Sequence, residues 1–415
     1  MHARGPRSAP TLPAACHPLP ARCRRPVPSS PRRHRALPGG LTARGVRAFH
    51  RGSQPVVRSA CATIHLAALR ANLQRVRELA AGARIMAVVK ADGYGHGLER
   101  VAHALAGADA FGVAAIADGQ RLRAAGVHQR IVVLAGPDAP GDLAELRRLR
   151  LDAVIHDDAQ LAWLEADTDP RPLRLWLKLD TGMHRLGFAP ARARELHARL
   201  RALPGVDPAL VLMTHFANSD VFDDASTARQ IECFAQATHG LDGEHSLANS
   251  AALLGWPAAR GQWLRVGGLL YGMSVVAGTT AADFGFAPAM TLATRLVAVH
   301  TLRQGDHVGY AASWQCPQDM PVGVAAIGYG DGYPRHAASG TPVLVGGRRA
   351  AVIGRVSMDL VTIDLRNVPD ARVGDAVVLW GPQLPVEQVA AHAGTIAYAL
   401  TCGVTRRVRF AEDAG

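Results

Sequence analysis

Lysine is the residue type that this sequence most conspicuously lacks. Of 46 basic residues only two, Lys90 and Lys178, are lysine, and the others are arginine. Lysine is ordinarily a common residue, so arginine stands here wherever a positive charge alone is needed. A lysine amine can lose its proton inside a protein, whereas an arginine guanidinium does not. The two remaining lysines are therefore candidates for sites that need a neutral amine.

Paired cysteines and long apolar runs are missing as well. The six cysteines are scattered, and no CxxC motif or Cys/His cluster occurs, which argues against a structural zinc site and favours a reduced, cytoplasmic compartment. No run of eighteen apolar residues is present, so we expect no membrane span. With 48% hydrophobic and 19% charged residues, the composition is that of a globular protein. A length of 415 residues leaves room for two or three domains.

Acidic residues are absent from the first 58 positions, and the first acid is Glu78. Residues 1–58 hold twelve arginines and ten of the 26 prolines, so they account for the whole formal charge of +12. The rest of the chain is neutral, and we expect no nucleic-acid partner for it, although a basic arm can bind phosphate nonspecifically. We predict that residues 1–58 are a disordered extension or follow from a start codon placed too far upstream, since they also lack the apolar core of a secretory signal.

From residue 85 onward, short β-branched runs alternate with stretches of helical length. The eight runs cover residues 85–90, 111–115, 130–135, 152–156, 175–180, 210–215, 245–250 and 264–268. Apolar strands that alternate with helices are typical of a parallel sheet, and eight such units predict an α/β fold, a (β/α)8 TIM-like barrel. A doubly wound open sheet is the alternative, but no GxGxxG motif opens any of the helices.

After about residue 285 strand-like runs follow one another directly. They cover residues 291–300, 307–310, 322–328, 342–345, 350–354, 360–365 and 376–380. This pattern predicts a mostly antiparallel C-terminal β domain, with a helix near 386–398 and a final strand at 404–410. We therefore predict three segments: the extension at 1–58, a barrel at 59–284 and a β domain at 285–415.

Polar residues fall where the predicted barrel strands end, which is where barrel enzymes carry their chemistry. They are Lys90, Lys178, Asp180, His215, Asn249, Ser250 and Arg265. A lysine that closes an apolar strand is partly desolvated, and this lowers the pKa of its amine and favours imine formation. The glycines of the following segment 91–97 let the backbone approach a ligand closely. These residues by themselves predict an imine-forming enzyme, either an aldolase or a pyridoxal-phosphate (PLP) enzyme.

The segment Val88–Gly97, VVKADGYGHG, resembles the PLP-lysine signature of the alanine racemases. The resemblance extends through almost all of residues 59–415, in the family's order, over seven further motifs: Lys178–Gly187, Met213–Asp220, Ala248–Ala251, Arg265–Gly272, Val308–Tyr310, Ile327–Tyr333 and Gly354–Asp359. It implies a PLP-dependent interconversion of L- and D-alanine that supplies D-alanine for peptidoglycan. It also implies a homodimer in which each active site joins one subunit's barrel to the β domain of its partner.

The resemblance assigns the two catalytic bases and the residues around them. Lys90 would hold PLP covalently and act as one base, and Tyr310, supplied by the partner subunit, would be the opposing base. Arg265 would hydrogen-bond the pyridine nitrogen, and His215 would link Arg265 to Tyr310. Arg185 would position both the substrate carboxylate and Tyr310.

The remaining positions bind phosphate, line the substrate site or carry a modification. The phosphate would lie against Tyr94, Ser250, Gly267 and Gly268. The partner subunit would contribute Tyr329, Met358 and Asp359 to the substrate site. Lys178 would be carbamylated, as in some members of the family. From the residues alone, Lys178 could equally pair with Asp180, and His215 could be a hydrogen-bonded core histidine.

The chemistry agrees with this assignment, because racemisation removes a proton from one face of the substrate and delivers one to the other, which two opposed bases do directly. An arginine opposite the ring nitrogen, in place of an aspartate, argues against a transaminase or decarboxylase. The alternatives that stay open are a racemase of broader specificity, a barrel-type PLP decarboxylase and a non-enzymatic PLP carrier.

The sequence departs from the family pattern at three positions. Val266 replaces the proline of the RPG motif, and His65 stands where an early aspartate is common. Arg406 is expected at the place of a C-terminal tyrosine that contacts phosphate in some members. None of these departures removes a catalytic group.

Overall fold

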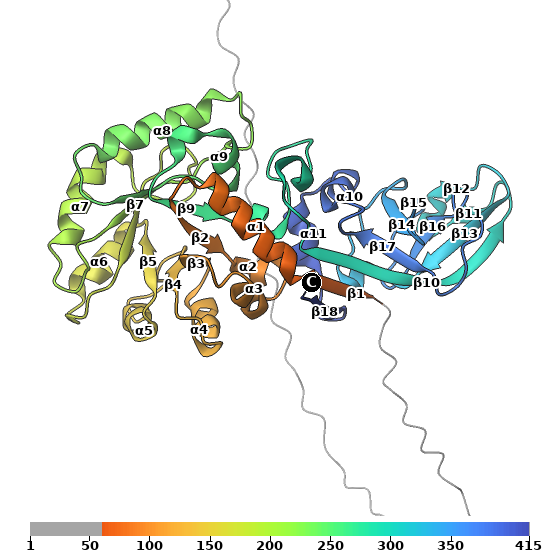
Figure 1. The fold of residues 1–415 in the computed structure, drawn as a ribbon, viewed down its shortest axis with the longest axis horizontal. Helices are drawn as coiled ribbons and strands as arrows, with labels where there is room; N and C mark the ends of the chain where they lie inside the picture. Colours follow the sequence, from red (N-terminus) through yellow and green to blue (C-terminus); the bar gives the residue numbers. More distant parts are fainter. Residues whose placement is uncertain (1–59, 415) are drawn as a thin grey trace, which may run out of the picture. The chain divides into compact units, whose positions relative to one another are not determined.

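The computed structural model describes residues 60–414, which form a barrel and a C-terminal β domain (Figure 1). The prediction for residues 1–58 lies outside the described residues. Within them, no helix is both long and apolar enough to cross a membrane.

The barrel consists of eight parallel strands in the order β8-β7-β6-β5-β4-β3-β2-β9. Their bounds are β2 Arg84–Val88, β3 Ala110–Val113, β4 Arg130–Val133, β5 Asp152–Ile155, β6 Leu175–Lys178, β7 Val211–Met213, β8 Glu244–Ser246 and β9 Trp263–Val266. Each of the strands β3 to β8 pairs with the strand before it in the chain, and the last strand, β9, returns to pair with β2. This confirms the predicted barrel and excludes the doubly wound sheet, because strand order never reverses.

Helices cover the outside of these strands (Figure 1). They are α1 Leu66–Leu79, α2 Lys90–Tyr94, α3 Leu98–Ala104, α4 Ile116–Ala124, α5 Asp142–Leu149, α6 Asp158–Ala166, α7 Ala193–Arg201, α8 Ala225–Thr238 and α9 Ser250–Gly255. In α1 the buried Leu69, Leu73 and Val76 recur every three or four residues, which gives the helix one apolar face. Helix α6 begins after Asp157, whose carboxylate accepts a hydrogen bond from the Ala159 amide at 2.8 Å.

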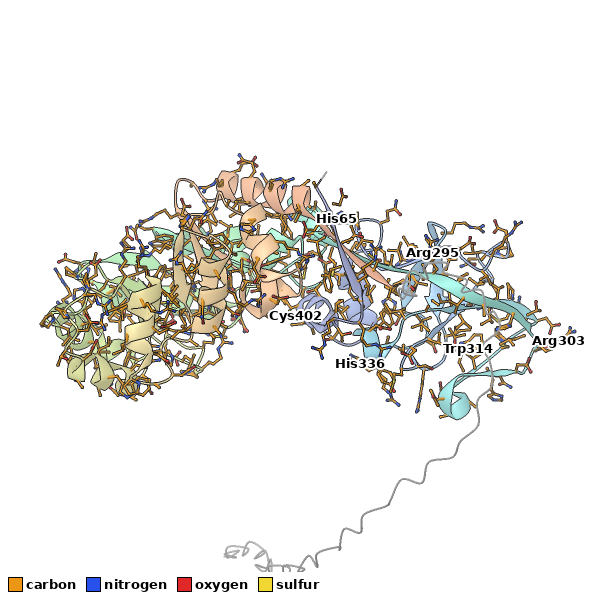
Figure 2. All side chains as sticks on the ribbon, turned by 90° about the horizontal axis from the view of Figure 1, so that it is seen from below. His65, Arg295, Arg303, Trp314, His336 and Cys402 are labelled. Atoms are coloured by element: carbon orange, nitrogen blue, oxygen red, sulfur yellow. The ribbon has the colours of Figure 1, made fainter. Side chains whose placement is uncertain are left out.

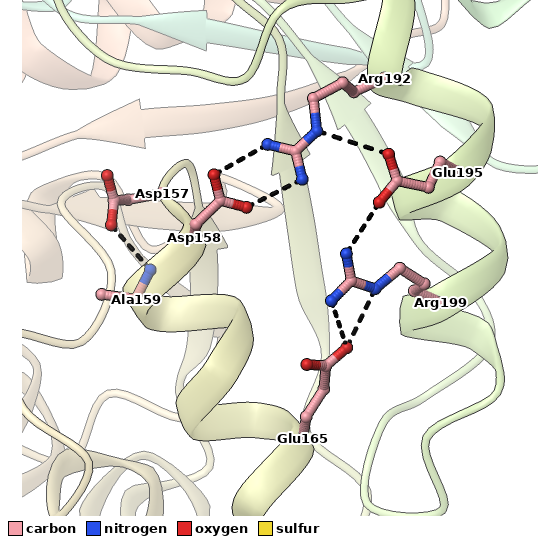
Figure 3. A network of polar contacts seen from close by, with 7 residues as sticks. All are labelled: Asp157, Asp158, Ala159, Glu165, Arg192, Glu195 and Arg199. Carbon is pink, nitrogen blue, oxygen red and sulfur yellow. Dashed lines mark hydrogen bonds and ion pairs between the residues drawn. The ribbon is translucent and has the colours of Figure 1, made fainter.

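The outer helices are joined by arginine ion pairs, as Figure 3 shows for α6 and α7. The Arg192 guanidinium makes two 2.8 Å hydrogen bonds to Asp158, and Arg199 contacts both Glu195 and Glu165 at 2.8 Å. These forked contacts use the planar geometry of arginine, which a lysine ammonium does not offer. Arginine therefore forms the surface ion pairs that other proteins divide between arginine and lysine.

The barrel interior is a packed core and not a channel. Its buried residues are Met86, Ala110, Val132, Val154, Trp176, Val211, Met213 and Trp263. At the N-terminal ends of the strands the Trp176 and Trp263 rings lie 5.5 Å apart, and the Arg84 guanidinium lies 4.3 Å above the Trp263 ring. Because this end is filled, a ligand can be taken up only at the opposite, C-terminal ends of the strands.

The C-terminal domain contains a second eight-stranded sheet, in the order β13-β16-β15-β14-β17-β10-β1-β18, with β13 also paired to β10. The strands are β1 Cys61–His65, β10 Met290–Leu302, β13 Met320–Ala325, β14 Pro342–Val345, β15 Arg348–Val352, β16 Val361–Asp364, β17 Ala376–Trp380 and β18 Arg409–Asp413, and a small separate sheet pairs β11 His307–Val308 with β12 Trp314–Gln315. All pairings are antiparallel except that of β1 with β18, so the predicted architecture is confirmed.

Strand β1 is the element that the sequence did not reveal. It belongs to the C-terminal sheet, where Cys61 pairs with Ala293 of β10 and with Arg409 of β18. His65, labelled in Figure 2, closes this arrangement, since its ring nitrogens contact Asp413 at 3.2 Å and Thr291 at 2.8 Å. The segment boundaries 59–284 and 285–415 stay a prediction, but the C-terminal sheet also uses residues 61–65.

Two predictions near the C-terminus were wrong. The helix expected at 386–398 is two helices, α10 Val386–His392 and α11 Ala397–Gly403, because Gly394 has a left-handed φ of 61° that ends the first. The last strand spans Arg409–Asp413 and not 404–410, because Thr405 is bound to the 3-10 helix Tyr329–Asp331, its amide donating to the Asp331 carbonyl at 3.0 Å.

Candidate functional site

A cavity of about 900 Å³ opens at the C-terminal ends of the barrel strands, with α10 and α11 along one side. Its lining includes nine residues proposed from the sequence: Lys90, Tyr94, Lys178, Arg185, His215, Ser250, Arg265, Gly267 and Gly268. These residues come from positions spread over almost 180 residues of the chain, and the barrel brings them to one place. No group of His, Cys, Asp and Glu side chains suited to a metal ion occurs within residues 60–414.

Lys90 lies two residues after the end of β2 and begins a strained turn. Ala91, Asp92 and Tyr94 each have a φ of 53°, in the left-handed region that costs roughly 1–2 kcal/mol for a residue with a Cβ. Asp92 stabilises the turn by accepting hydrogen bonds from the Leu98 amide at 3.2 Å and from Arg121 at 2.8 Å. The Lys90 side chain opens to the cavity, yet surrounding protein desolvates its amine and lowers the pKa.

Hydroxyl groups and glycine backbone meet in one part of the cavity. The Gly267 amide donates to Ser250 Oγ at 2.9 Å, and a Cβ on Gly267 would lie 2.6 Å from the Tyr94 hydroxyl. A Cβ on Gly268 would overlap the Tyr398 hydroxyl. Burial raises the pKa of Tyr94 to about 12 and also raises that of Tyr398, so both hydroxyls stay protonated at neutral pH. This cradle of neutral donors suits a phosphate group.

Arg265 lies buried at the end of β9 and is held by four carbonyl or hydroxyl acceptors. It donates to the carbonyls of Ser246 and Thr214 and to Ser246 Oγ at 2.7 Å, and to the Leu247 carbonyl at 3.0 Å. Its Nη2 lies 3.2 Å from His215 Nδ1. Burial lowers the pKa of Arg265 to about 10, which leaves the guanidinium charged at neutral pH.

Because a guanidinium can only donate, His215 Nδ1 is the acceptor of this hydrogen bond. Burial and the charge of Arg265 lower the pKa of His215 well below its usual value, so the ring is neutral and carries its proton on Nε2. The Nε of Arg265 makes no hydrogen bond to any other described residue. It is the donor left for a ligand in the cavity.

Lys178 lies at the end of β6 with only 7% of its surface exposed. Burial, Arg265 and Arg185 lower the pKa of its amine to about 8. The neighbouring Asp180 uses one carboxylate oxygen to accept the amides of residues 182–184, each at 3.0 Å. In the described part of the chain no hydrogen bond or ion pair joins Lys178 to Asp180, so the simple pairing considered from the sequence is not formed.

The other four predicted residues lie on the C-terminal domain and do not line the cavity. Tyr310 is 66% exposed, Met358 52% and Tyr329 37%. The Tyr329 amide donates to the Ser357 carbonyl at 3.0 Å, which holds Tyr329 next to the Met358 loop. Asp359, in the same loop, is partly exposed and pairs with Arg407.

Residues 64–275 match the family model for the N-terminal domain of alanine racemase, and residues 289–411 match the model for its C-terminal domain. The chain belongs to the alanine racemase family. The predicted family is thereby confirmed over both domains.

Several members of the alanine racemase family are similar along nearly their whole length. An alanine racemase of Nitrosococcus oceani is 53% identical over 348 residues, 84% of this chain and 97% of the relative, and one of Vibrio cholerae is 48% identical over 354 residues, 85% of this chain and 98% of the relative. The crystal structure of a biosynthetic alanine racemase from Pseudomonas aeruginosa is similar with a TM-score of 0.84 at 44% identity, covering 86% of this chain and all of that one.

The expectation for Arg406 was wrong, and the structure identifies a tyrosine that was overlooked. Arg406 is exposed and does not line the cavity. Tyr398 of α11 lines the cavity instead, with its ring 5.5 Å from that of Tyr94. The sequence contained one indication of this, because a C-terminal tyrosine was expected and Tyr398 is the only tyrosine after Tyr333.

Proposed function

We propose that this protein interconverts L- and D-alanine with PLP bound in the cavity, and so supplies D-alanine for peptidoglycan. The observation that carries the proposal is that Lys90, an amine with a lowered pKa, lines the same cavity as the hydroxyl cradle and Arg265. The protein would act in the cytoplasm as a homodimer.

The residues of the cavity fit PLP. Tyr94, Tyr398 and Ser250, with the backbone of Gly267 and Gly268, would hold the phosphate. Arg265 Nε would donate to the pyridine nitrogen, and Lys90 Nζ would bind the cofactor covalently. When bound, PLP supplies an electron sink for negative charge at the substrate Cα. Because Arg265 keeps its proton, the ring nitrogen would stay unprotonated and that sink would be moderate, which suits racemisation better than transamination.

Two residues would exchange protons with the substrate Cα from opposite faces. Lys90 Nζ would serve one face, and Tyr310 Oη, from the β domain of the second subunit, would serve the other. The 66% exposure of Tyr310 supports this arrangement, because a base must be shielded from water to act and its own protomer does not shield it. Arg185, at the mouth of the same cavity, would bind the substrate carboxylate. Tyr329, Met358 and Asp359 of the second subunit would border the substrate.

We also propose that Lys178 is carbamylated. Its neutral amine would add to carbon dioxide, forming an N–C bond and releasing one proton. The resulting carbamate anion would lie near Arg185 and Arg265, whose positive charges now lower the pKa of the Lys178 amine. Acetate should therefore restore activity to a Lys178→Ala variant, whereas a plain ammonium in crystals grown at high bicarbonate would contradict the modification.

A chiral assay of the purified protein against a panel of L-amino acids tests the proposed function. We expect D-alanine from L-alanine, and little product from longer side chains. Equal turnover of serine, lysine and arginine would instead indicate a racemase of broader specificity. Release of carbon dioxide with an amine product would indicate a decarboxylase and overturn the proposal.

A further inference from the structure

Tyr271 lies near the end of the Arg265–Gly272 motif, and the proposed function assigns it no role. It is fully buried at the end of a short 3-10 helix, Gly268–Tyr271. Its hydroxyl donates to the Val88 carbonyl at 3.0 Å. Its ring lies 4.7 Å from the ring of Tyr94 and 4.8 Å from that of His96. One side chain thus touches the chain just before Lys90 and just after it.

The hydrogen bond to Val88 supplies a donor on the β9 side of β2, where pairing with β9 stops, while Val88 is still paired with Gly112 of β3. The paired register of β2 with β9 ends at Ala87 and Val266, one residue before Val88. A buried carbonyl without a donor is strongly unfavourable. The Tyr271 hydroxyl therefore fixes the end of β2, two residues ahead of Lys90.

The turn that follows needs restraint from outside. Five consecutive residues, 91–95, are left-handed, and three of them carry a Cβ. Such a conformation persists only where its surroundings hold it. The rings of Tyr271 and His96 hold its far end, and His96 Nδ1 lies 2.9 Å from the Tyr94 carbonyl. Burial lowers the pKa of His96 to about 4, so the ring is neutral and donates its Nδ1 proton to that carbonyl.

We propose that Tyr271, assisted by His96, is a positioning residue that fixes Lys90 Nζ relative to the Tyr94 hydroxyl. The distance between Lys90 Nζ, where the cofactor would be attached, and the phosphate cradle is thereby held constant, although a strained turn separates the two. The proposal rests on the proposed function, because it takes Lys90 as the lysine that carries PLP. Neither side chain lines the cavity, so both act through Lys90 and Tyr94.

The test uses the holoenzyme with Tyr271→Phe, which keeps the ring and removes the donor to Val88. We expect kcat to fall and PLP release to quicken, each by about five- to thirtyfold, as for a buried group left without its partner. The pH midpoint of the absorbance of the lysine-bound cofactor should rise, because a less restrained Lys90 is better hydrated. A purely structural role would lower the thermal midpoint and leave that absorbance titration unchanged.

Tyr333→Phe is the matched control. Tyr333 is equally buried, and its ring stacks 6.4 Å from that of Trp380 in the C-terminal domain. Its hydroxyl has no hydrogen-bond partner among residues 60–414. Removing it should change neither kcat, PLP release nor the absorbance titration.

A second variant keeps the proposal testable if Tyr271→Phe fails to fold. His96→Phe retains a ring against Tyr271 but removes the donor to the Tyr94 carbonyl, so it should move the same titration in the same direction. Borohydride reduction of the wild type separates the two proposals: no pyridoxyl group on Lys90 would refute the proposed function itself. If Lys90 is labelled but Tyr271→Phe or His96→Phe behaves like Tyr333→Phe in all three readouts, the inference alone is wrong.

Discussion

The two ends of the barrel use cations in opposite ways. At the N-terminal end each cation faces an acid: Arg130 pairs with Asp152, which also accepts the Trp176 indole at 2.9 Å, and Arg84 pairs with Glu244. At the C-terminal end Lys90, Lys178, Arg185 and Arg265 line one cavity, whose described lining includes only two carboxylates, Asp220 and Glu387.

This difference separates a structural cluster from a binding site. In an ion pair the two charges compensate each other, so the pair needs no charged ligand. Burial, together with repulsion between cations that share a cavity, lowers the pKa values of Lys90 and Lys178. An anion such as a phosphate, a carboxylate or a carbamate would relieve that repulsion. The predictions below test this contrast between the two ends.

The largest effect is expected from Lys90→Ala, which removes the cofactor attachment and one base. Turnover should fall by at least about 10⁴-fold in both directions. The absorbance of lysine-bound cofactor should disappear, whereas the thermal midpoint should change little because the side chain opens to the cavity. Peptide mapping after borohydride reduction that placed the pyridoxyl group on Lys178 would contradict the assignment.

Tyr310→Phe should slow racemisation by roughly 10²–10⁴-fold while PLP stays bound. In D2O, α-proton exchange from L-alanine should be lost, and exchange from D-alanine should persist through Lys90. Mixed dimers with Lys90→Ala provide the control, because one of their two sites contains neither change. Mixing the inactive variants should recover about a quarter of wild-type activity if sites are shared between subunits. No recovery in demonstrated mixed dimers would contradict a shared site.

Lys178→Met should cut activity about ten- to hundredfold by removing a charged partner from the site. In carbon-dioxide-free buffer its effect on stability should depend on pH. The folded pKa of about 8 lies below the ordinary 10.5, so the buried ammonium destabilises the fold below pH 8. This cost fades as the pH rises from 8 to 10.5. Lys178→Met should thus be more stable than wild type by about 3 kcal/mol at pH 7 and by nothing near pH 11, and a pH-independent difference in denaturant unfolding would refute this.

Trp263→Phe at the opposite end should give the smallest effect on catalysis. It removes the indole that donates to Glu244 at 2.8 Å and leaves the aromatic packing largely in place. We expect a loss of about 1–3 kcal/mol in the free energy of unfolding, with kcat and KM unchanged. A large fall in kcat without a change in the free energy of unfolding would show that the N-terminal end of the barrel also takes part in catalysis.

Much of the barrel and its site could be predicted from local pattern. Each barrel strand is an apolar run followed by a helix, and the predicted runs overlap all eight strands from β2 to β9. The scarcity of lysine pointed to Lys90 and Lys178 before any motif was considered, and both line the cavity. The same reasoning did not find Tyr398 or Tyr271, because neither stands at a strand end.

The sequence by itself determined the order of elements, the family and the residue types of the site, because periodicity and motifs are local properties of the chain. Only the tertiary structure decided that β1 pairs with β10 and β18, since a five-residue strand at the start of the described chain carries no mark of partners some 230 and 350 residues away. It likewise decided that the Tyr271 hydroxyl donates to the Val88 carbonyl, two residues before Lys90. These contacts join positions distant in sequence, and their existence depends on how the sheet closes, which no local pattern encodes.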